Sequence, residues 1–160
     1  MKNIFSGSEI VELGIQIEKN GSDFYDILSK RSKNQATAEI FDFLAKEEEK
    51  HIEVFRGILE KLQIYVPPVY AEEYFAYMNA LAGEYVFTQK DQGKEIAKKI
   101  TSDKEAVEMG IGLEKDSIIF YEGIKEMVPG HDKAIVDKLI EEERKHFRRL
   151  SDLKKEIGGN

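Results

Sequence analysis

Two Glu-x-x-His pairs, Glu48/His51 and Glu143/His146, constrain this chain more than any other feature. Each pair lies in a stretch whose apolar residues recur at a helical period. Residues three apart on an α-helix share a face, so each pair directs one carboxylate and one imidazole toward the same point. The chain has only three histidines, and two of them stand in this arrangement. Two matched pairs indicate one site that is assembled from two similar halves.

A wider internal repeat surrounds the two pairs. Residues 12–19 (ELGIQIEK) resemble residues 108–115 (EMGIGLEK), which begin 96 positions later. The two Glu-x-x-His pairs are 95 positions apart, which is almost the same offset. A Phe-Tyr dipeptide follows each of the two octapeptides, at Phe24-Tyr25 and at Phe120-Tyr121. The sequence therefore predicts two copies of one helical hairpin, with an insertion between the copies.

Helix-capping and helix-stopping residues divide the chain into four long helices. Ser-x-x-Glu capping boxes that open at Ser6 and Ser102 predict two helix starts, and Pro67-Pro68 and Pro129-Gly130 predict two helix ends. No strand-type alternation is sustained, so the expected fold class is all-α. We expect a single domain over residues 1–160, composed of a hairpin over 7–62, a crossover over 63–101 and a second hairpin over 102–157.

The crossover is long and rich in aromatic residues, and residues 70–81 have helical spacing. We expect a short extra helix there. A long crossover lets the second and third long helices run parallel, as it does in four-helix bundles of one topological class. We interpret the aromatic side chains of residues 65–87 as a cover for the bundle or a dimer surface rather than a substrate pocket.

Potential metal ligands fall on the inward-facing seams of all four expected helices. In residues 136–157 only Glu143 and His146 interrupt the apolar seam, and in residues 41–62 only Glu48 and His51 do so. Each of the other two helices has one glutamate at a seam position. The expected ligands are Glu18, Glu48, His51, Glu114, Glu143 and His146.

Four carboxylates inside one bundle need a counter-charge. An unpaired buried carboxylate carries a large desolvation penalty and would take up a proton instead. Two divalent cations would neutralise all four, and oxygen with imidazole ligands suits iron or manganese. We therefore predict two metal ions per chain, with iron as the first choice and manganese or a mixed iron–manganese pair as alternatives.

Glu47 and Glu142 are the alternatives at two of these positions, because each lies four residues before a histidine. A seam through Glu142 would include Arg149, whereas the seam through its neighbour Glu143 is otherwise apolar. We therefore choose Glu143, and the repeat then selects Glu48 over Glu47. A Glu-rich run on its own would be typical of a solvated helix face.

The ligand pattern resembles the rubrerythrin branch of the ferritin-like di-iron carboxylate superfamily, over most of the chain outside residues 65–100. The resemblance implies a ferritin-like four-helix bundle with a non-haem di-iron centre. In that family a tyrosine two turns after the glutamate of the first or third helix donates a hydrogen bond to a ligand carboxylate. The resemblance assigns this role beside the ligands to Tyr25 and Tyr121.

The chain departs from the related families in its lack of cysteine and at two positions, Ser117 and Glu49. The chain has no cysteine and so cannot include the rubredoxin domain that rubrerythrin appends; electrons would come from a separate donor protein. Ser117 stands where rubrerythrin has a second glutamate that exchanges with a histidine on oxidation. Gly21 has the matching place in the first hairpin, and close packing and room for a small oxidant are both open interpretations. Glu49 stands where bacterioferritin has a haem-binding methionine, so we expect no haem.

Charge and hydropathy exclude other partners. The net charge of −7 argues against nucleic acid and against an anionic membrane surface. We find no basic segment followed by an apolar core near the N-terminus and no apolar run of membrane-spanning length. We therefore expect a cytoplasmic protein.

The leading functional hypothesis is a non-haem di-iron oxidoreductase that reduces peroxide or dioxygen with electrons from a partner protein. We expect it to be a homodimer. Glu48 and Glu143 would bridge the two ions, and Glu18 and Glu114 would each bind one ion. A second hypothesis is a ferroxidase that stores iron in an oligomeric cage. A third is a structural helical module with a vestigial site.

Overall fold

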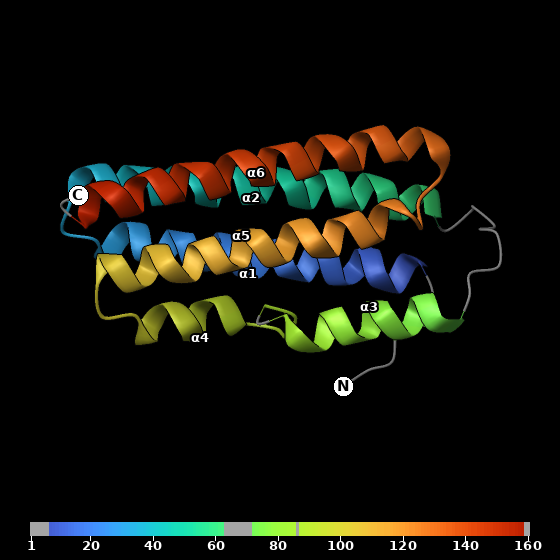
Figure 1. Ribbon diagram of the computed structural model, residues 1–160, viewed down its shortest axis with the longest axis horizontal. Coiled ribbons are helices and arrows are strands. Elements are labelled where there is room, and N and C mark those ends of the chain that lie inside the picture. Colours follow the sequence, from blue (N-terminus) through green and yellow to red (C-terminus); the bar gives the residue numbers. More distant parts are fainter. Residues whose placement is uncertain (1–6, 63–71, 86, 159–160) are drawn as a thin grey trace.

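The computed structural model describes residues 7–62, 72–85 and 87–158. Four long helices form the bundle, namely α1 (Gly7–Arg31), α2 (Gln35–Leu62), α5 (Asp103–Lys125) and α6 (Gly130–Ile157) (Figure 1). Two shorter helices, α3 (Glu72–Glu84) and α4 (Gln92–Lys99), lie between α2 and α5 in the chain. The described residues include no strand. The predicted all-α, ferritin-like four-helix bundle is confirmed, with α3 close to the extra helix expected from residues 70–81.

Capping residues define the start of α5. Ser102 is the N-cap, and its hydroxyl accepts a hydrogen bond from the backbone N–H of Glu105 at 3.1 Å. The Glu105 carboxylate in turn accepts a hydrogen bond from the backbone N–H of Thr101 at 3.2 Å. This predicted helix start is therefore confirmed, with Thr101 as the reciprocal donor. The other predicted box, at Ser6, and the stop at Pro67-Pro68 fall partly or wholly outside the described residues.

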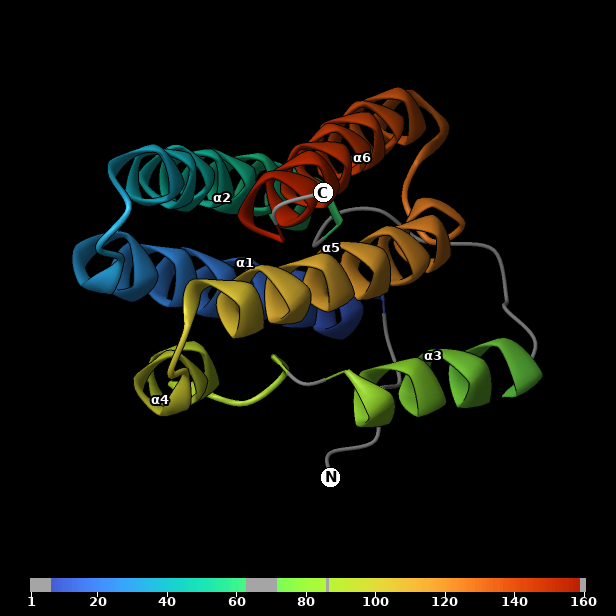
Figure 2. The same ribbon diagram turned by 60° about the vertical axis from the view of Figure 1, so that its left-hand side comes forward.

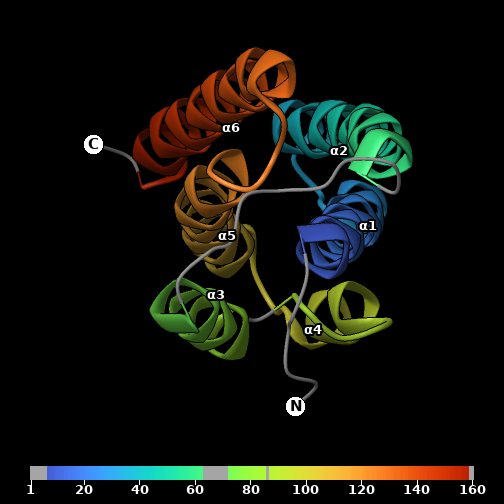
Figure 3. The same cartoon turned by 90° about the vertical axis from the view of Figure 1, so that its right-hand side faces the viewer.

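The bundle consists of two hairpins that lie side by side. Viewed along the bundle, α2 and α6 form one layer and α1 and α5 form the next (Figure 3). The closest packing is within the hairpins α1–α2 and α5–α6, whereas α2 and α6 approach each other much less closely. The colours of Figure 1 show that α2 and α5 run in the same direction, as the long crossover predicts.

The crossover covers the outer face of α1 and α5 (Figures 2 and 3). The ring of Phe87 packs edge-on against Phe24 of α1 with centroids 5.4 Å apart, and Tyr85 packs against Phe120 of α5 at 6.4 Å. Phe24 and Phe120 are counterparts in the repeat, so the crossover contacts both hairpins at the same level. These two aromatic residues of the crossover are buried and act as a cover, whereas Tyr77 is exposed. Tyr65 and Tyr70 lie outside the described residues.

The sequence analysis predicts no helix at residues 92–99, where the structure has α4. This helix is attached to α1 by Asn20, whose side-chain amide donates to the carbonyls of Phe87 at 2.9 Å and Gln89 at 2.7 Å. The Asn20 side-chain oxygen accepts from the backbone N–H of Gly93 at 3.2 Å. A Cβ on Gly93 would lie only 2.0 Å from the Asn20 carbonyl oxygen, so the contact requires glycine. Tertiary hydrogen bonds therefore hold α4 in place together with the buried side chain of Ala97.

The core of the bundle is mainly apolar, and its main group of buried polar residues lies at the middle. Large side chains such as Phe41, Phe55 and Leu44 are fully buried. Near the midpoint of each long helix the apolar seam is interrupted by glutamate or by glutamate and histidine. Among the described residues, no helix is both long and apolar enough to cross a bilayer.

Candidate metal centre

The structure brings all six predicted ligands together at the middle of the bundle. Glu18 comes from α1, Glu114 from α5, and one Glu-x-x-His pair from each of α2 and α6. Each of the six side chains belongs to a residue that is at most 4% exposed. Burying six ionisable groups in one place needs a compensating interaction, because a buried charge without a partner is strongly destabilising.

The six residues form two overlapping groups. Within each group, every residue offers one ligand atom, and these atoms all lie within 4.8 Å of one another. The first group is Glu18, Glu48, His51 and Glu143, and the second is Glu48, Glu114, Glu143 and His146. Glu48 and Glu143 belong to both groups. This arrangement fits two neighbouring cation positions, with Glu48 and Glu143 within reach of both.

The two imidazoles face the shared centre with the same nitrogen. His51 Nδ1 is 2.7 Å from Glu143 Oε1 and 3.4 Å from Glu18 Oε1. His146 Nδ1 is 3.4 Å from Glu48 Oε1 and 3.8 Å from a Glu114 oxygen. The two rings lie nearly parallel, with an interplanar angle of 15° and centroids 5.6 Å apart.

Most of the buried side-chain atoms without a hydrogen-bond partner in the described part of the chain belong to these six residues. They are Glu18 Oε2, Glu48 Oε1, His51 Nδ1, Glu114 Oε2, both Glu143 oxygens and His146 Nδ1. The short contact between His51 and Glu143 does not have hydrogen-bond geometry. Native structures rarely leave buried polar atoms unpaired, because each costs about 1–3 kcal/mol. Oxygen and imidazole donors that converge without partners fit a site for two metal ions.

The carboxyl groups are also buried close to one another. Burial and the nearby charge of Glu48 raise the pKa of Glu18 well above its usual value. Burial and the charges of Glu48 and Glu114 do the same to the pKa of Glu143. Burial acts in the same direction on Glu48, but its close contacts with Glu18 and His146 outweigh burial and lower its pKa. Burial and mutual repulsion therefore disfavour the charged forms of Glu18 and Glu143 unless a cation lies beside them.

Burial lowers the pKa of a histidine, whereas it raises the pKa of a carboxyl group. Burial lowers the pKa of His51, but the nearby negative charge of Glu18, 3.4 Å from its Nδ1, and the other carboxylates around the ring outweigh burial and raise that pKa to about 10. For His146, the nearby carboxylates of Glu114 and Glu48 likewise outweigh burial and raise its pKa to about 10. Protons thus supply the counter-charge where metal ions would otherwise do so, and metal binding has to displace them.

Tyr25 and Tyr121 connect the two hairpins beside the centre. The Tyr25 hydroxyl donates a hydrogen bond to Glu114 Oε1 at 2.7 Å, and the Tyr121 hydroxyl donates to Glu18 Oε1. Each tyrosine therefore holds the glutamate of the other hairpin by one oxygen, and the second oxygen of each glutamate has no partner. Burial raises the pKa of both tyrosines, so both hydroxyls keep the proton that they donate.

Glu142 has a contact that the sequence analysis does not predict. Its carboxylate oxygen Oε2 lies 2.8 Å from His51 Nε2, the ring nitrogen that faces away from the centre. Glu47, His51 and Glu142 form a third group on this outer side. The side chains of Glu47 and Glu142 are 18% and 32% exposed, so they are not part of the buried set. From the sequence both acids are only alternative ligands, and a spacing of four residues would place Glu142 beside His146 rather than beside His51.

Gly21 and Ser117 lie one turn after Glu18 and Glu114, and both are in closely packed surroundings. A Cβ on Gly21 would lie 3.0 Å from Glu48 Oε2, so glycine leaves room for that carboxylate. The hydroxyl of Ser117 is hydrogen-bonded to the hydroxyl of Tyr85, which also bonds to the Leu113 carbonyl at 3.0 Å. Of the two interpretations, the geometry favours close packing at both positions.

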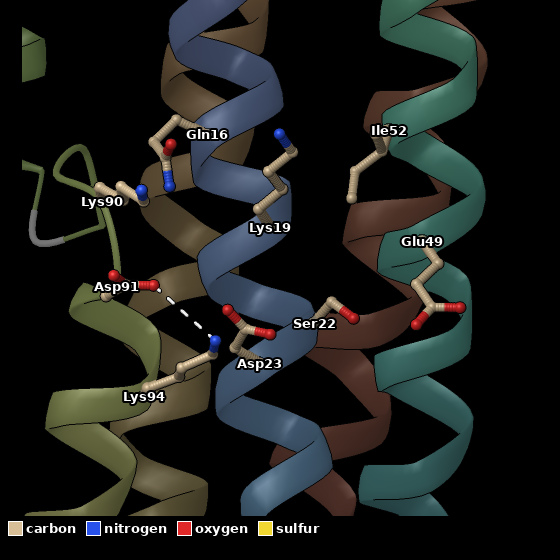
Figure 4. A pocket seen from close by; sticks show the side chains of 9 residues that line it. All are labelled: Gln16, Lys19, Ser22, Asp23, Glu49, Ile52, Lys90, Asp91 and Lys94. Atoms are coloured by element: carbon tan, nitrogen blue, oxygen red, sulfur yellow. Dashed lines mark ion pairs between the residues drawn. The ribbon is translucent and has the colours of Figure 1, made fainter.

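A groove of about 510 Å³ lies outside the bundle, between α1, α2 and the start of α4 (Figure 4). Its charged lining residues carry both signs and are Lys19, Asp23, Glu49, Lys90, Asp91 and Lys94. Asp91 and Lys94 pair with each other at 3.8 Å. None of the six predicted ligands lines this groove. The balanced charges select no particular ligand, so the buried centre is the candidate functional site.

Comparison with protein families agrees with this site. The sequence matches the profile of the family named Rubrerythrin over residues 9–154. The chain belongs to the Rubrerythrin family. The matched segment includes all six candidate ligands and both tyrosines, and the resemblance found in the sequence analysis is confirmed.

The fold also resembles a solved structure. The crystal structure of a Thermotoga maritima protein assigned to the ferritin-like diiron-carboxylate proteins is similar over 98% of this chain and 99% of that chain. The two sequences are 27% identical, and the TM-score is 0.73. A comparison with curated proteins gave no match.

Proposed function

We propose that this chain is a non-haem di-iron oxidoreductase that reduces peroxide or dioxygen with electrons from a separate protein. The observation that carries the proposal is the set of unpaired, inward-facing donor atoms on four glutamates and two histidines. Membership of the Rubrerythrin family and similarity to a diiron-carboxylate protein support iron as the metal.

Each residue of the centre has a distinct part in this proposal. Glu18 and His51 would hold one ion and Glu114 and His146 the other, and Glu48 and Glu143 would be shared by the two ions, because only these two residues belong to both buried ligand groups. When bound, the two iron ions supply Lewis acidity and electrons for cleaving an O–O bond.

The rest of the chemistry depends on the protein. Four carboxylates neutralise two dications, so the centre can be buried without excess charge. Tyr25 and Tyr121 fix the terminal glutamates and hold a proton at their hydroxyl oxygens, close to the ligands. The rings of Phe41 and Phe55 pack against these tyrosines at 6.0 Å and 4.9 Å between centroids and exclude water from that side. The result is a dry site with O–H donors beside it.

Anaerobic loading with iron(II), followed by separate additions of peroxide and oxygen, tests the function. We expect two irons per chain and a fast change in the near-ultraviolet absorption with at least one of the two oxidants. Glu143→Ala should lose tight binding, whereas Glu141→Ala, which changes an exposed residue of the same helix, should bind two irons as the unaltered chain does. Retention of two irons by the Glu143 variant would refute the ligand assignment.

Native mass spectrometry of the same preparation tests the proposed homodimer. A dimer agrees with the oxidoreductase, whereas a large closed cage that accumulates iron would favour ferroxidation and storage. A chain that binds no iron at all would favour the vestigial site.

A further inference from the structure

We propose that Glu142 is a positioning residue for His51, and that it makes the His51 half of the centre the first to bind a metal ion. This inference rests on the proposed two-metal site and adds an order of filling to it. It starts from a difference between two halves that the sequence repeat makes almost equivalent.

The difference lies at the outer nitrogens of the two histidines. His51 Nε2 is 2.8 Å from Glu142 Oε2, which reaches it from the other hairpin. Within the described residues, His146 Nε2 has no carboxylate within 4 Å, and its ion-pair contacts are all made by Nδ1. The ring of Phe43 instead lies edge-on to His146 at 6.2 Å, and the Arg149 guanidinium covers Phe43 at 4.5 Å.

The repeat makes this difference informative. Glu47 is the counterpart of Glu142, 95 positions earlier, and in a symmetric centre it would bind His146. The Glu47 carboxylate instead pairs with Lys50 at 2.7 Å and lies on the His51 side of the seam. Glu47 and Glu142 therefore both lie beside His51. The outer side of His146 instead has the ring of Phe43, with Arg149 over that ring.

A carboxylate at the outer nitrogen has a defined effect on a ligand imidazole. A neutral imidazole has one N–H and one lone pair, so an acceptor at Nε2 keeps the proton there and leaves the lone pair on Nδ1. Nδ1 of His51 is the nitrogen that faces Glu18 and Glu143. The hydrogen bond also holds the ring orientation and makes the ligand more basic, and such outer partners change metal affinity about 10–100-fold.

The same reasoning excludes the outer group of Glu47, His51 and Glu142 as a third metal site. His51 cannot offer a lone pair from Nε2 while Nδ1 binds an ion in the centre, unless the ring loses both protons. Glu142 therefore acts as the acceptor of the Nε2 proton. The first ion should enter the group of Glu18, Glu48, His51 and Glu143.

Zinc titration of the full metal-free chain, followed by ¹H–¹⁵N spectra of the imidazoles, tests this order. The chain has only three histidines, and the third, His131, is exposed and serves as a reference. We expect the His51 signals to change with the first equivalent of Zn²⁺ and the His146 signals with the second. The Nε2 proton of His51 should be visible and slow to exchange with water.

Three variants separate positioning from simple charge. Glu142→Ala should weaken the first binding step about 10–100-fold and abolish the order of filling, with little effect on the second step. Glu142→Gln keeps an acceptor oxygen and should recover part of the affinity and the slow Nε2 proton. Glu47→Gln removes a charge from the same outer group without removing the bond to His51, and it should keep the order of filling.

Simultaneous changes of the His51 and His146 signals in the unaltered chain would overturn the proposal. So would an unchanged first step and an unchanged Nε2 proton in both Glu142 variants. Failure of the unaltered chain to bind zinc at all would overturn the two-metal site itself, which is a different result from two ions that bind with equal affinity.

Discussion

The two hairpins, α1–α2 and α5–α6, carry the same residues where they face the shared centre and different residues where they face other parts of the molecule. The matched positions are Glu18 with Glu114, Glu48 with Glu143, His51 with His146 and Tyr25 with Tyr121. The tyrosines show how closely the match is kept, because each donates a hydrogen bond to the terminal glutamate of the opposite hairpin. The centre is thus assembled from equal contributions.

Away from the centre the match is lost. Asn20 binds three backbone groups of the crossover, whereas its counterpart, Asp116, is half-buried on the face of α5. Gly21 makes room for Glu48, whereas its counterpart, Ser117, is bonded to Tyr85 of the crossover. The crossover occurs once, so it contacts the two copies through the repeated pair Phe24 and Phe120 but bonds to different polar residues in each. The ligand candidates and their tyrosines are therefore repeated, whereas the polar residues that attach the crossover are not.

The largest expected effect comes from the shared carboxylates, which should behave alike in the two hairpins. Glu48→Ala and Glu143→Ala should each lose both ions, because each belongs to both ligand groups. Glu18→Ala removes a ligand from one group only and should keep about one ion per chain. Metal content after anaerobic iron loading measures this. If Glu18→Ala and Glu48→Ala had the same metal content, the bridging assignment would be wrong.

The next effect is a pH dependence of the stability of the metal-free protein, to which both hairpins contribute. In the metal-free protein the pKa values of His51 and His146 are raised to about 10, so the fold binds more protons than the unfolded chain above pH about 6.5. The stability that these protons contribute is present below about pH 6.5 and is lost as pH rises toward 10. The raised pKa values of Glu18 and Glu143 act in the same direction from lower pH.

Metal ions must displace these protons, so the affinity for metal should rise with pH. The stability of the metal-free fold should fall over the same range. Each displaced proton corresponds to about tenfold in affinity per pH unit. Thermal unfolding at pH 6, 7.5 and 9, with and without Mn²⁺, measures the effect. The increase in Tm on adding metal should grow at each step. An increase that shrinks toward pH 9 would contradict the proton-for-metal exchange.

A smaller effect, on the free energy of unfolding, should differ between the two hairpins. Asn20→Ala removes a buried side chain that makes three hydrogen bonds, and we expect a loss of about 2–4 kcal/mol in the free energy of unfolding. Asp116→Ala, the matched change in the other hairpin, should change stability by less than about 0.5 kcal/mol. Urea unfolding of the metal-free variants compares them. Equal losses at the two positions would show that Asn20 does not anchor the crossover.

The smallest effect should again be equal in the two halves. Tyr25→Phe and Tyr121→Phe each remove one buried hydrogen bond to a terminal glutamate, at a cost of about 0.5–1.5 kcal/mol. Metal affinity should fall only slightly in either variant. Urea unfolding of the metal-free variants measures the loss of stability, and calorimetric titration with Mn²⁺ measures the affinity. A large effect of one tyrosine alone would break the equivalence of the hairpins at the centre.

The sequence was sufficient to predict the bundle and the convergence of the six ligand candidates, because helical period and spacing determine which side chains share a face. Glu143 could be separated from Glu142 by the apolar seam around it. The same reasoning could not predict α4, which depends on hydrogen bonds from Asn20 to residues far along the chain. Nor could it predict the bond between Glu142 and His51, because symmetry places an acid beside each histidine and only packing decides which one it reaches.

Anomalous diffraction at the iron edge, from crystals of the anaerobically iron(II)-loaded chain, tests the central claim most directly. We expect two iron peaks inside the bundle. Glu48 and Glu143 should contact both peaks, and one histidine should bind each peak through Nδ1. A single peak, or peaks outside the four long helices, would contradict it.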